Sequence, residues 1–298
     1  MKHHIEEHDL GLTHDIAVIS RRRALRMLGA GLGVGATAIA AGCSSRSADP
    51  AQDSVASTTV VQAAPQETQG PYPGDGSNGP NVLIESGIVR HDITSSFGSY
   101  SGTAQGVPVT LSMTMQDLVK DGAAGTGMAV YVWQCDREGR YSLYSEGATE
   151  QNYLRGVQVA DDNGRVTFQT IFPACYPGRW PHIHFEVFDS LETAVAGSDA
   201  RLTSQIALPA ETCSAVFDYD DGYAESIANI AQLSLDTDGV FGDGWDAELA
   251  SVTGSPQTGM DVAITIGVAD RESNIAQDTG FGRPAVPPPG GPAGPPPR

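Results

Sequence analysis

Basic side chains are scarce in this chain of 298 residues, which has 17 lysines and arginines against 36 aspartates and glutamates. Five of the basic residues and four of the acids lie in the first 42 positions. The rest of the chain therefore has 12 basic and 32 acidic side chains, a net charge of −20. A surface this acidic repels the phosphate backbone of nucleic acids and anionic lipid headgroups. The composition argues against nucleic acid as a partner and against basic docking to a membrane.

Long apolar runs, repeats of fixed period and glycine-rich phosphate-binding loops are also missing. The apolar stretch at 28–41 is short and rich in glycine, so it does not suit a membrane span. The composition, 40% hydrophobic and 18% charged, is that of a globular protein. A chain of this length can bury a sizeable core in one or two domains.

The first 43 residues are typical of an export signal. A polar start is followed by SRRRALR at 20–26, the apolar stretch, and AAGC at 40–43. Arg21 and Arg22 resemble the twin arginines of a Tat signal, and the last four residues resemble a lipobox with an unusual alanine at position 40. We therefore expect an exported lipoprotein, anchored through Cys43 at the cell surface or on the outer side of the membrane. The alternative is a Sec signal with Cys43 unmodified.

Cysteine is equally scarce, with three residues left if Cys43 is lipidated. An odd number in an oxidising compartment suggests one disulfide and one free thiol. We expect Cys135 to pair with Cys213, because Cys175 lies in the loop of the candidate site described below. The alternative is three small buried thiols.

Composition divides the rest of the chain into three parts. Residues 44–66 are small and polar without periodicity and are expected to form a flexible tether. Residues 67–282 form one domain, and 283–298 are a Pro/Gly-rich tail expected to be disordered or polyproline-like.

Within the domain, apolar residues mostly alternate with polar ones, which is typical of half-buried strands. Turn signals such as DNG at 162–164 separate these stretches. The pattern predicts an all-β fold, an antiparallel β-sandwich with one or two short helices. A helical period is plausible only at 221–233. The expected strands are 107–115, 128–133, 166–171, 182–188 and 260–266.

Four of the seven histidines lie in or before the leader, which leaves His91, His182 and His184. His182 and His184 are separated by one residue in an apolar strand, so both imidazoles point to the same face and can bind one ion. Taken alone, such a pair is more often a surface pair or a hydrogen-bonded core pair.

Two tyrosines and an arginine stand close to this pair. Tyr176 and Arg179 belong to a loop stiffened by proline and glycine that leads into the histidine strand, and Tyr141 follows another strand and turn. Two phenolates and two neutral imidazoles suit ferric iron better than copper or zinc. Either tyrosine alone would more often be an aromatic packed at a sheet edge.

Several ordered blocks of the chain resemble the intradiol ring-cleavage dioxygenases. They are WQCDREGRY at 133–141, YLRGVQV at 153–159 and YPGRWPHIHF at 176–185, preceded by ETQGPYP at 67–73 and RHDI at 90–93. The resemblance covers residues 66–268 and is strongest to the shorter, exported branch. It implies Fe(III) bound by Tyr141, Tyr176, His182 and His184, with Arg179, Tyr176 and Gln205 as catalytic residues.

The activity implied by this resemblance is cleavage of a catechol-type ring by O2, between the two hydroxylated carbons, without an organic cofactor. The residues do not distinguish catechol, hydroxyquinol, protocatechuate or lignin-derived aromatics as the substrate. They do not give the oligomeric state either, and a homo-oligomer is possible. Two alternatives are a cell-surface β-sandwich that binds carbohydrate or protein without catalysis, and a zinc-dependent hydrolase.

Overall fold

The computed structural model describes residues 61–197 and 199–273. The predicted leader with Cys43, most of the tether and the C-terminal tail lie outside these residues. Within them, no helix is both long and apolar enough to cross a membrane.

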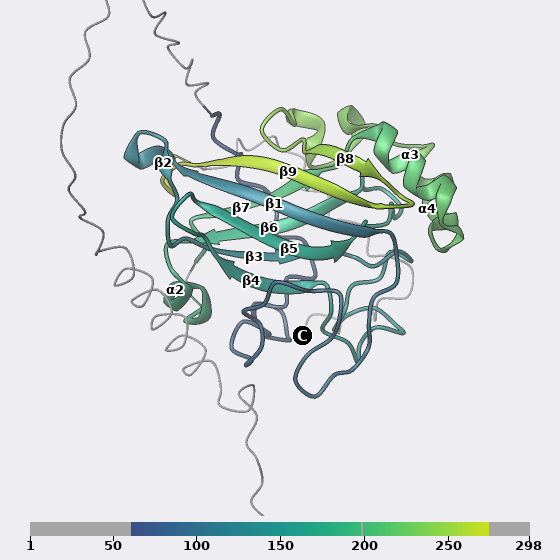
Figure 1. The fold of residues 1–298 in the computed structure, drawn as a ribbon, viewed down its shortest axis with the longest axis horizontal. Coiled ribbons are helices and arrows are strands. Elements are labelled where there is room, and N and C mark those ends of the chain that lie inside the picture. The colour runs from purple at the N-terminus through teal and green to yellow at the C-terminus, as the bar shows by residue number, and fades with distance from the viewer. Residues whose placement is uncertain (1–60, 198, 274–298) are drawn as a thin grey trace, which may run out of the picture.

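Two β-sheets make up the domain, and Figure 1 shows strands β1, β5 and β9 of the first sheet lying across strands of the second. The first sheet runs β2-β1-β9-β8, with β5 also paired to β1, and the second runs β4-β3-β6-β7. Their bounds are β1 Pro108–Asp117, β2 Ala123–Ala124, β3 Ala129–Trp133, β4 Arg155–Val159, β5 Arg165–Ile171, β6 His182–Phe188, β7 Leu202–Ala207, β8 Ser251–Ser255 and β9 Gly259–Val268. The predicted all-β sandwich is therefore confirmed.

One pairing differs from the antiparallel expectation. Strand β1 pairs with β9 in parallel, with Val109 opposite Met260 and Asp117 opposite Val268. Alternation of apolar residues reveals which face of a strand is buried but not the direction of its neighbour. The other pairings between named strands are antiparallel.

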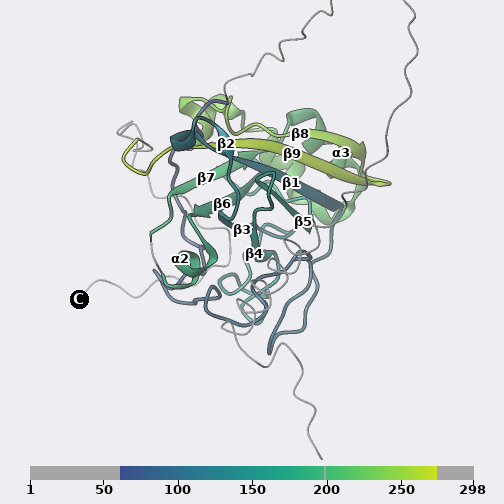
Figure 2. The ribbon, with the colours of Figure 1, turned by 60° about the vertical axis from the view of Figure 1, so that its left-hand side comes forward.

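Within residues 61–197 and 199–273, three α-helices join the strands: α2 Leu191–Val195, α3 Ala210–Tyr219 and α4 Ala224–Ile230. In both views α2 and α3 lie at opposite ends of the strands (Figures 1 and 2). The predicted helix at 221–233 is present as the 3-10 turn Asp221–Tyr223 followed by α4. Helix α3 was not expected, although its buried residues Cys213, Val216 and Phe217 have helical spacing.

The second sheet is covered on both faces, which is why β3 and β6 are buried along their whole length. Alternation places Ile183, Phe185 and Val187 of β6 in the hydrophobic core, where Leu111 and Met113 of β1 also lie. The histidines of β6 occupy the opposite face. Strand β6 therefore separates these apolar side chains from its two histidines.

Residues just before the predicted start of the domain at residue 67 contact its strands. Ala64 is buried, and its N–H donates to the carbonyl of Gly267 at 2.9 Å. Gln66 Oε1 accepts from the backbone N–H of Thr203 at 3.1 Å. A run of small residues predicts a tether, whereas Ala64 packs where its small side chain fits beside β9.

The predicted disulfide between Cys135 and Cys213 is wrong, because Cys135, Cys175 and Cys213 are all free and buried. Their Sγ atoms point to three different carbonyls, of Ala174, Arg179 and Leu208 respectively. Burial raises the pKa of all three thiols, to about 12 for Cys175. The alternative of three buried thiols describes the structure.

Candidate metal centre

The two candidate histidines lie side by side on β6, on the face away from the core. In the sheet register Trp133 of β3 and Gln205 of β7 are the direct neighbours of His184. The rings of Trp133 and His184 stack with centroids 4.9 Å apart and planes 4° from parallel. This stacking fixes the plane in which the His184 imidazole lies.

Four candidate ligand atoms meet at one point above this face. His182 Nε2 lies 3.1 Å from His184 Nε2, 3.4 Å from Tyr141 Oη and 3.3 Å from Tyr176 Oη. The two phenol oxygens are 3.4 Å apart. Four ligands about 2.0–2.1 Å from a tetrahedral ion would stand roughly 3.3–3.4 Å from one another. The spacing of these atoms therefore fits a shared metal ion.

Each histidine presents its Nε2 atom to this centre. His182 Nδ1 is 2.5 Å from the carbonyl oxygen of Trp180, so Nδ1 carries the proton and the lone pair of Nε2 is free to bind metal. His184 Nδ1 is buried and has no hydrogen-bond partner among the described residues. Burial, followed by neighbouring positive charge, lowers the pKa of both imidazoles well below the usual value. Both are therefore neutral, as metal ligands must be.

The tyrosines need a cation before they can serve as phenolates. Burial raises the pKa of Tyr176 to about 12 and that of Tyr141 well above its usual value. A multivalent cation bonded to the oxygen reverses this effect. The described residues contain no group of three or more His, Cys, Asp and Glu side chains that could hold a metal, so a metal centre here depends on the two tyrosines.

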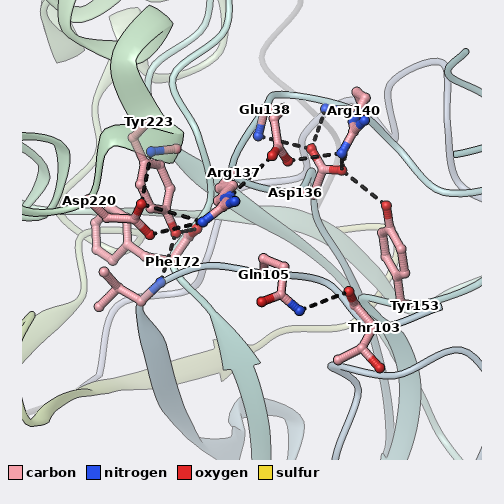
Figure 3. A network of polar contacts seen from close by, with 12 residues as sticks. Thr103, Gln105, Asp136, Arg137, Glu138, Arg140, Tyr153, Phe172, Asp220 and Tyr223 are labelled. Atoms are coloured by element: carbon pink, nitrogen blue, oxygen red, sulfur yellow. Dashed lines mark hydrogen bonds and ion pairs between the residues drawn. The ribbon is translucent and has the colours of Figure 1, made fainter. Parts of the chain in front are cut away.

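A polar network holds the turn that carries Tyr141 (Figure 3). Asp136 Oδ1 accepts from the backbone N–H groups of Glu138 at 3.1 Å and Arg140 at 2.9 Å. Its Oδ2 accepts from Arg140 Nε at 2.9 Å and from Tyr153 Oη at 3.0 Å. The buried carboxylate of Asp136 holds the backbone of this turn, and the turn fixes the position of the residue that follows it, Tyr141.

Arg155 is a second organising residue, to which the sequence interpretation gave no role. Its side chain is fully buried and donates from all three nitrogens. The acceptors are the carbonyls of Tyr72, Pro73 and Ser142 and the hydroxyls of Ser142 and Tyr131, at 2.8–3.1 Å. Arg155 thus ties the segment at 72–73 to the residue that follows Tyr141.

The N-terminal segment passes directly over the histidines. A Cβ atom at Gly70 would lie 3.3 Å from His184 Cε1, and the backbone there has a φ of +72°. Both the close approach and the left-handed conformation favour glycine. The ring of Tyr72 follows, with its centroid 5.0 Å from that of Tyr141.

The structure brings together Arg179 and Gln205, the two other candidate site residues. Arg179 Nη2 donates to Gln205 Oε1 at 2.6 Å, and Gln205 Nε2 donates to the carbonyl of Thr68 at 3.0 Å. Arg179 Nε also lies 3.1 Å from Asp238 Oδ2, an ion pair that the sequence did not suggest. His91, the third histidine outside the leader, is exposed.

Comparison with known proteins agrees with this geometry. The model of a family described as Dioxygenase matches residues 79–209, which include all six candidate site residues. An intradiol ring-cleavage dioxygenase from Tetranychus urticae has a similar structure, with a TM-score of 0.54 and 22% identity over 73% of this chain and 98% of that one. A second solved dioxygenase matches with a TM-score of 0.54 and 22% identity over 74% of this chain and 98% of the other. The family model matches the part of the chain that carries the candidate site, and the solved structures share its fold. Both findings agree with the resemblance found in the sequence.

Proposed function

We propose that the protein is a non-haem iron(III) intradiol dioxygenase. It inserts both atoms of O2 into a catechol-type ring and cleaves the ring between the two hydroxylated carbons, giving a cis,cis-muconate-type diacid. The observation that carries the proposal is the meeting of two tyrosine oxygens and two histidine nitrogens at 3.1–3.4 Å. The dioxygenase family model and the dioxygenase fold support it.

The ligand set favours iron over zinc. Phenolate is a hard, anionic oxygen donor and stabilises an oxidised, highly charged cation, whereas structural zinc sites mainly use thiolate and imidazole. When bound, ferric iron would supply a Lewis-acidic and redox-active centre for the catechol. A zinc hydrolase with the same residues would contain zinc and would need no oxygen.

The protein side chains have separate tasks in this scheme. As a phenolate, Tyr176 would hold the metal and would also be the base for a catechol hydroxyl, because burial raises the pKa of the free phenol to about 12 and so favours its protonation. The Arg179 guanidinium, held by Gln205, supplies fixed positive charge beside the centre, where negative charge grows on the ring. The carboxamide of Gln205 also fixes the Thr68 carbonyl and with it the segment above the histidines.

The purified protein should contain about one iron per chain and show a visible tyrosinate-to-iron absorption band. Tyr141→Phe and Tyr176→Phe should each shift or bleach the band, because each removes one phenolate donor. Tyr219→Phe is the matched control, since Tyr219 is 50% exposed on α3. Metal analysis and absorbance spectra test the prediction. Stoichiometric zinc, with no colour after ferric reconstitution, would refute the iron assignment.

Oxygen uptake with a panel of catechols tests the reaction and its substrate. Catechol, hydroxyquinol and protocatechuate should be compared on the iron-loaded protein, with product absorbance as a second signal. Uptake that is stoichiometric with ring-opened diacid supports the proposal. A protein that takes up no iron, stays colourless and consumes no oxygen with any of them supports the alternative of a β-sandwich that binds carbohydrate or protein without catalysis.

We also propose that the chain is exported through the Tat route and anchored at Cys43. Arg21→Lys together with Arg22→Lys should trap the precursor in the cytoplasm, because the Tat pathway reads the arginine pair. Cys43→Ala should release exported protein from the membrane fraction. Fractionation and immunoblotting measure both effects. Normal export of the twin-lysine variant would show that the leader uses the Sec route.

A further inference from the structure

Asp238 is a buried carboxylate outside the ligand set that contacts several parts of the candidate centre. It lies between the 3-10 turns Leu235–Thr237 and Phe241–Asp243, with its side chain fully inaccessible. Its Oδ1 accepts from the backbone N–H groups of Val240 at 2.8 Å and Phe241 at 3.1 Å. Its own loop therefore holds the carboxylate in one orientation.

Two further donors come from the loop between Tyr176 and His182. Asp238 Oδ2 accepts from the backbone N–H of Trp180 at 2.6 Å and from Arg179 Nε at 3.1 Å. A negative charge with four donors is well stabilised even when buried. Asp238 therefore fastens the loop that carries a candidate ligand to a separate part of the chain.

The contact with Trp180 reaches His182 through one residue. The backbone N–H of Trp180 donates to Asp238, and the carbonyl of Trp180 accepts from His182 Nδ1. The Trp180 indole donates to the carbonyl of Leu208 at 2.8 Å, which holds the side chain as well. Without Asp238, the N–H of Trp180 would lose its acceptor and the Trp180 backbone would become more mobile. The Trp180 carbonyl, which sets the His182 tautomer, would then be held less firmly.

The contact with Arg179 reaches Gln205 in a similar way. Nε of the guanidinium is bound by Asp238 and Nη2 by Gln205. With two nitrogens held by different residues, the planar group has its position and tilt fixed. The ring of Phe241, in the loop that follows Asp238, lies 5.9 Å from the guanidinium carbon.

We propose that Asp238 is a positioning residue that sets the His182 tautomer through Trp180 and the Arg179 guanidinium by direct contact. Its importance for catalysis rests on the proposed dioxygenase function, whereas its effect on the two side chains does not. The proposal therefore has a test that needs neither iron nor substrate.

Nitrogen-15 NMR of the metal-free protein provides that test. In the wild type, His182 should be a single Nδ1–H tautomer and the Arg179 Nε–H should exchange slowly with solvent. A His182 that carries its proton on Nε2, or an Arg179 Nε–H in fast exchange, would overturn the proposal in the unaltered protein. This measurement does not depend on whether any variant folds.

Asp238→Asn tests the cause, with Asp236→Asn as the matched control. Asp236 is an exposed carboxylate in the same loop, so the control removes the same charge without the contacts. Asp238→Asn should give mixed His182 tautomers and at least tenfold faster Arg179 Nε–H exchange, whereas Asp236→Asn should match the wild type. A folded Asp238→Asn variant with wild-type signals at both side chains would refute the positioning role.

Iron affinity and kinetics then connect the result to function. Asp238→Asn should bind iron about ten- to a hundredfold more weakly, the usual effect of losing a residue that orients a ligand. With iron in excess, kcat should fall more than KM rises. If the NMR changes occur but wild-type protein neither binds iron nor reacts with catechols, the proposed function fails and the positioning role stands. If wild-type protein is active and the NMR signals are unchanged in Asp238→Asn, the positioning role fails and the proposed function stands.

Discussion

Replacing Arg179 by alanine should lower turnover by about two to three orders of magnitude while iron content and colour stay close to those of the wild type. This is the scale for losing one preorganised electrostatic contact in a buried site. A guanidinium does not coordinate metal, and Asp238 would still hold the Trp180 N–H and with it His182. The loss should therefore fall on the stabilisation of negative charge in the substrate.

Two further variants separate charge from geometry. Arg179→Lys should recover only part of the rate. An ammonium group keeps the charge but does not bridge Asp238 and Gln205 as the planar guanidinium does. Arg137→Ala is the control, since this partly exposed arginine pairs with Glu138 and Asp220 instead. Steady-state kinetics and metal analysis decide the matter. If Arg179→Ala loses its iron, Arg179 has a structural role in the centre. If it turns over normally, Arg179 has no role in catalysis.

Replacing Arg155 by methionine should lower the free energy of unfolding by roughly 3–5 kcal/mol, a large fraction of the stability of a typical domain. The change removes five buried hydrogen bonds, to acceptors on Tyr72, Pro73, Tyr131 and Ser142. The Pro73 carbonyl keeps the Tyr131 hydroxyl as a donor, whereas the carbonyls of Tyr72 and Ser142 lose the donor that Arg155 supplied. Each unsatisfied group costs about 1–3 kcal/mol, partly recovered by local relaxation. Urea unfolding of the metal-free protein measures the difference.

Arg165→Met controls for the loss of positive charge, because Arg165 is an exposed residue at the start of β5. It should change the free energy of unfolding by no more than about 0.5 kcal/mol. A similarly small change in Arg155→Met would mean that water or a rearranged loop replaces the guanidinium. In that case the hydrogen bonds of Arg155 between the segment at 72–73 and the residue after Tyr141 do not stabilise the fold.

The sequence was informative about the centre because strand geometry is simple. In a strand, residues two apart share a face, so His182 and His184 could be paired without knowing the rest of the fold. The proline-rich loop before them placed Tyr176 and Arg179 close to the same face. Tyr141 was a candidate because it follows another strand and turn, and the resemblance to a family then added Gln205, which lies on another segment of the chain.

Other features depended on contacts that no local pattern encodes. Four aspartates lie between residues 236 and 246, and nothing in the sequence indicates that Asp238 is the one that turns inward to Arg179. The predicted disulfide was wrong for a related reason. An odd number of cysteines suggests a pair, but buried thiols that face separate carbonyls satisfy the same composition.

The parallel pairing of β1 with β9 has a consequence for how the protein is made. Partner residues in this pair are about 150 positions apart in the chain, and contacts over such distances form slowly. Translation must reach residue 268 before the middle of the first sheet can close. Until then β1 exposes one edge to which other chains could add. We expect truncation before β9 to yield aggregates rather than a smaller folded domain.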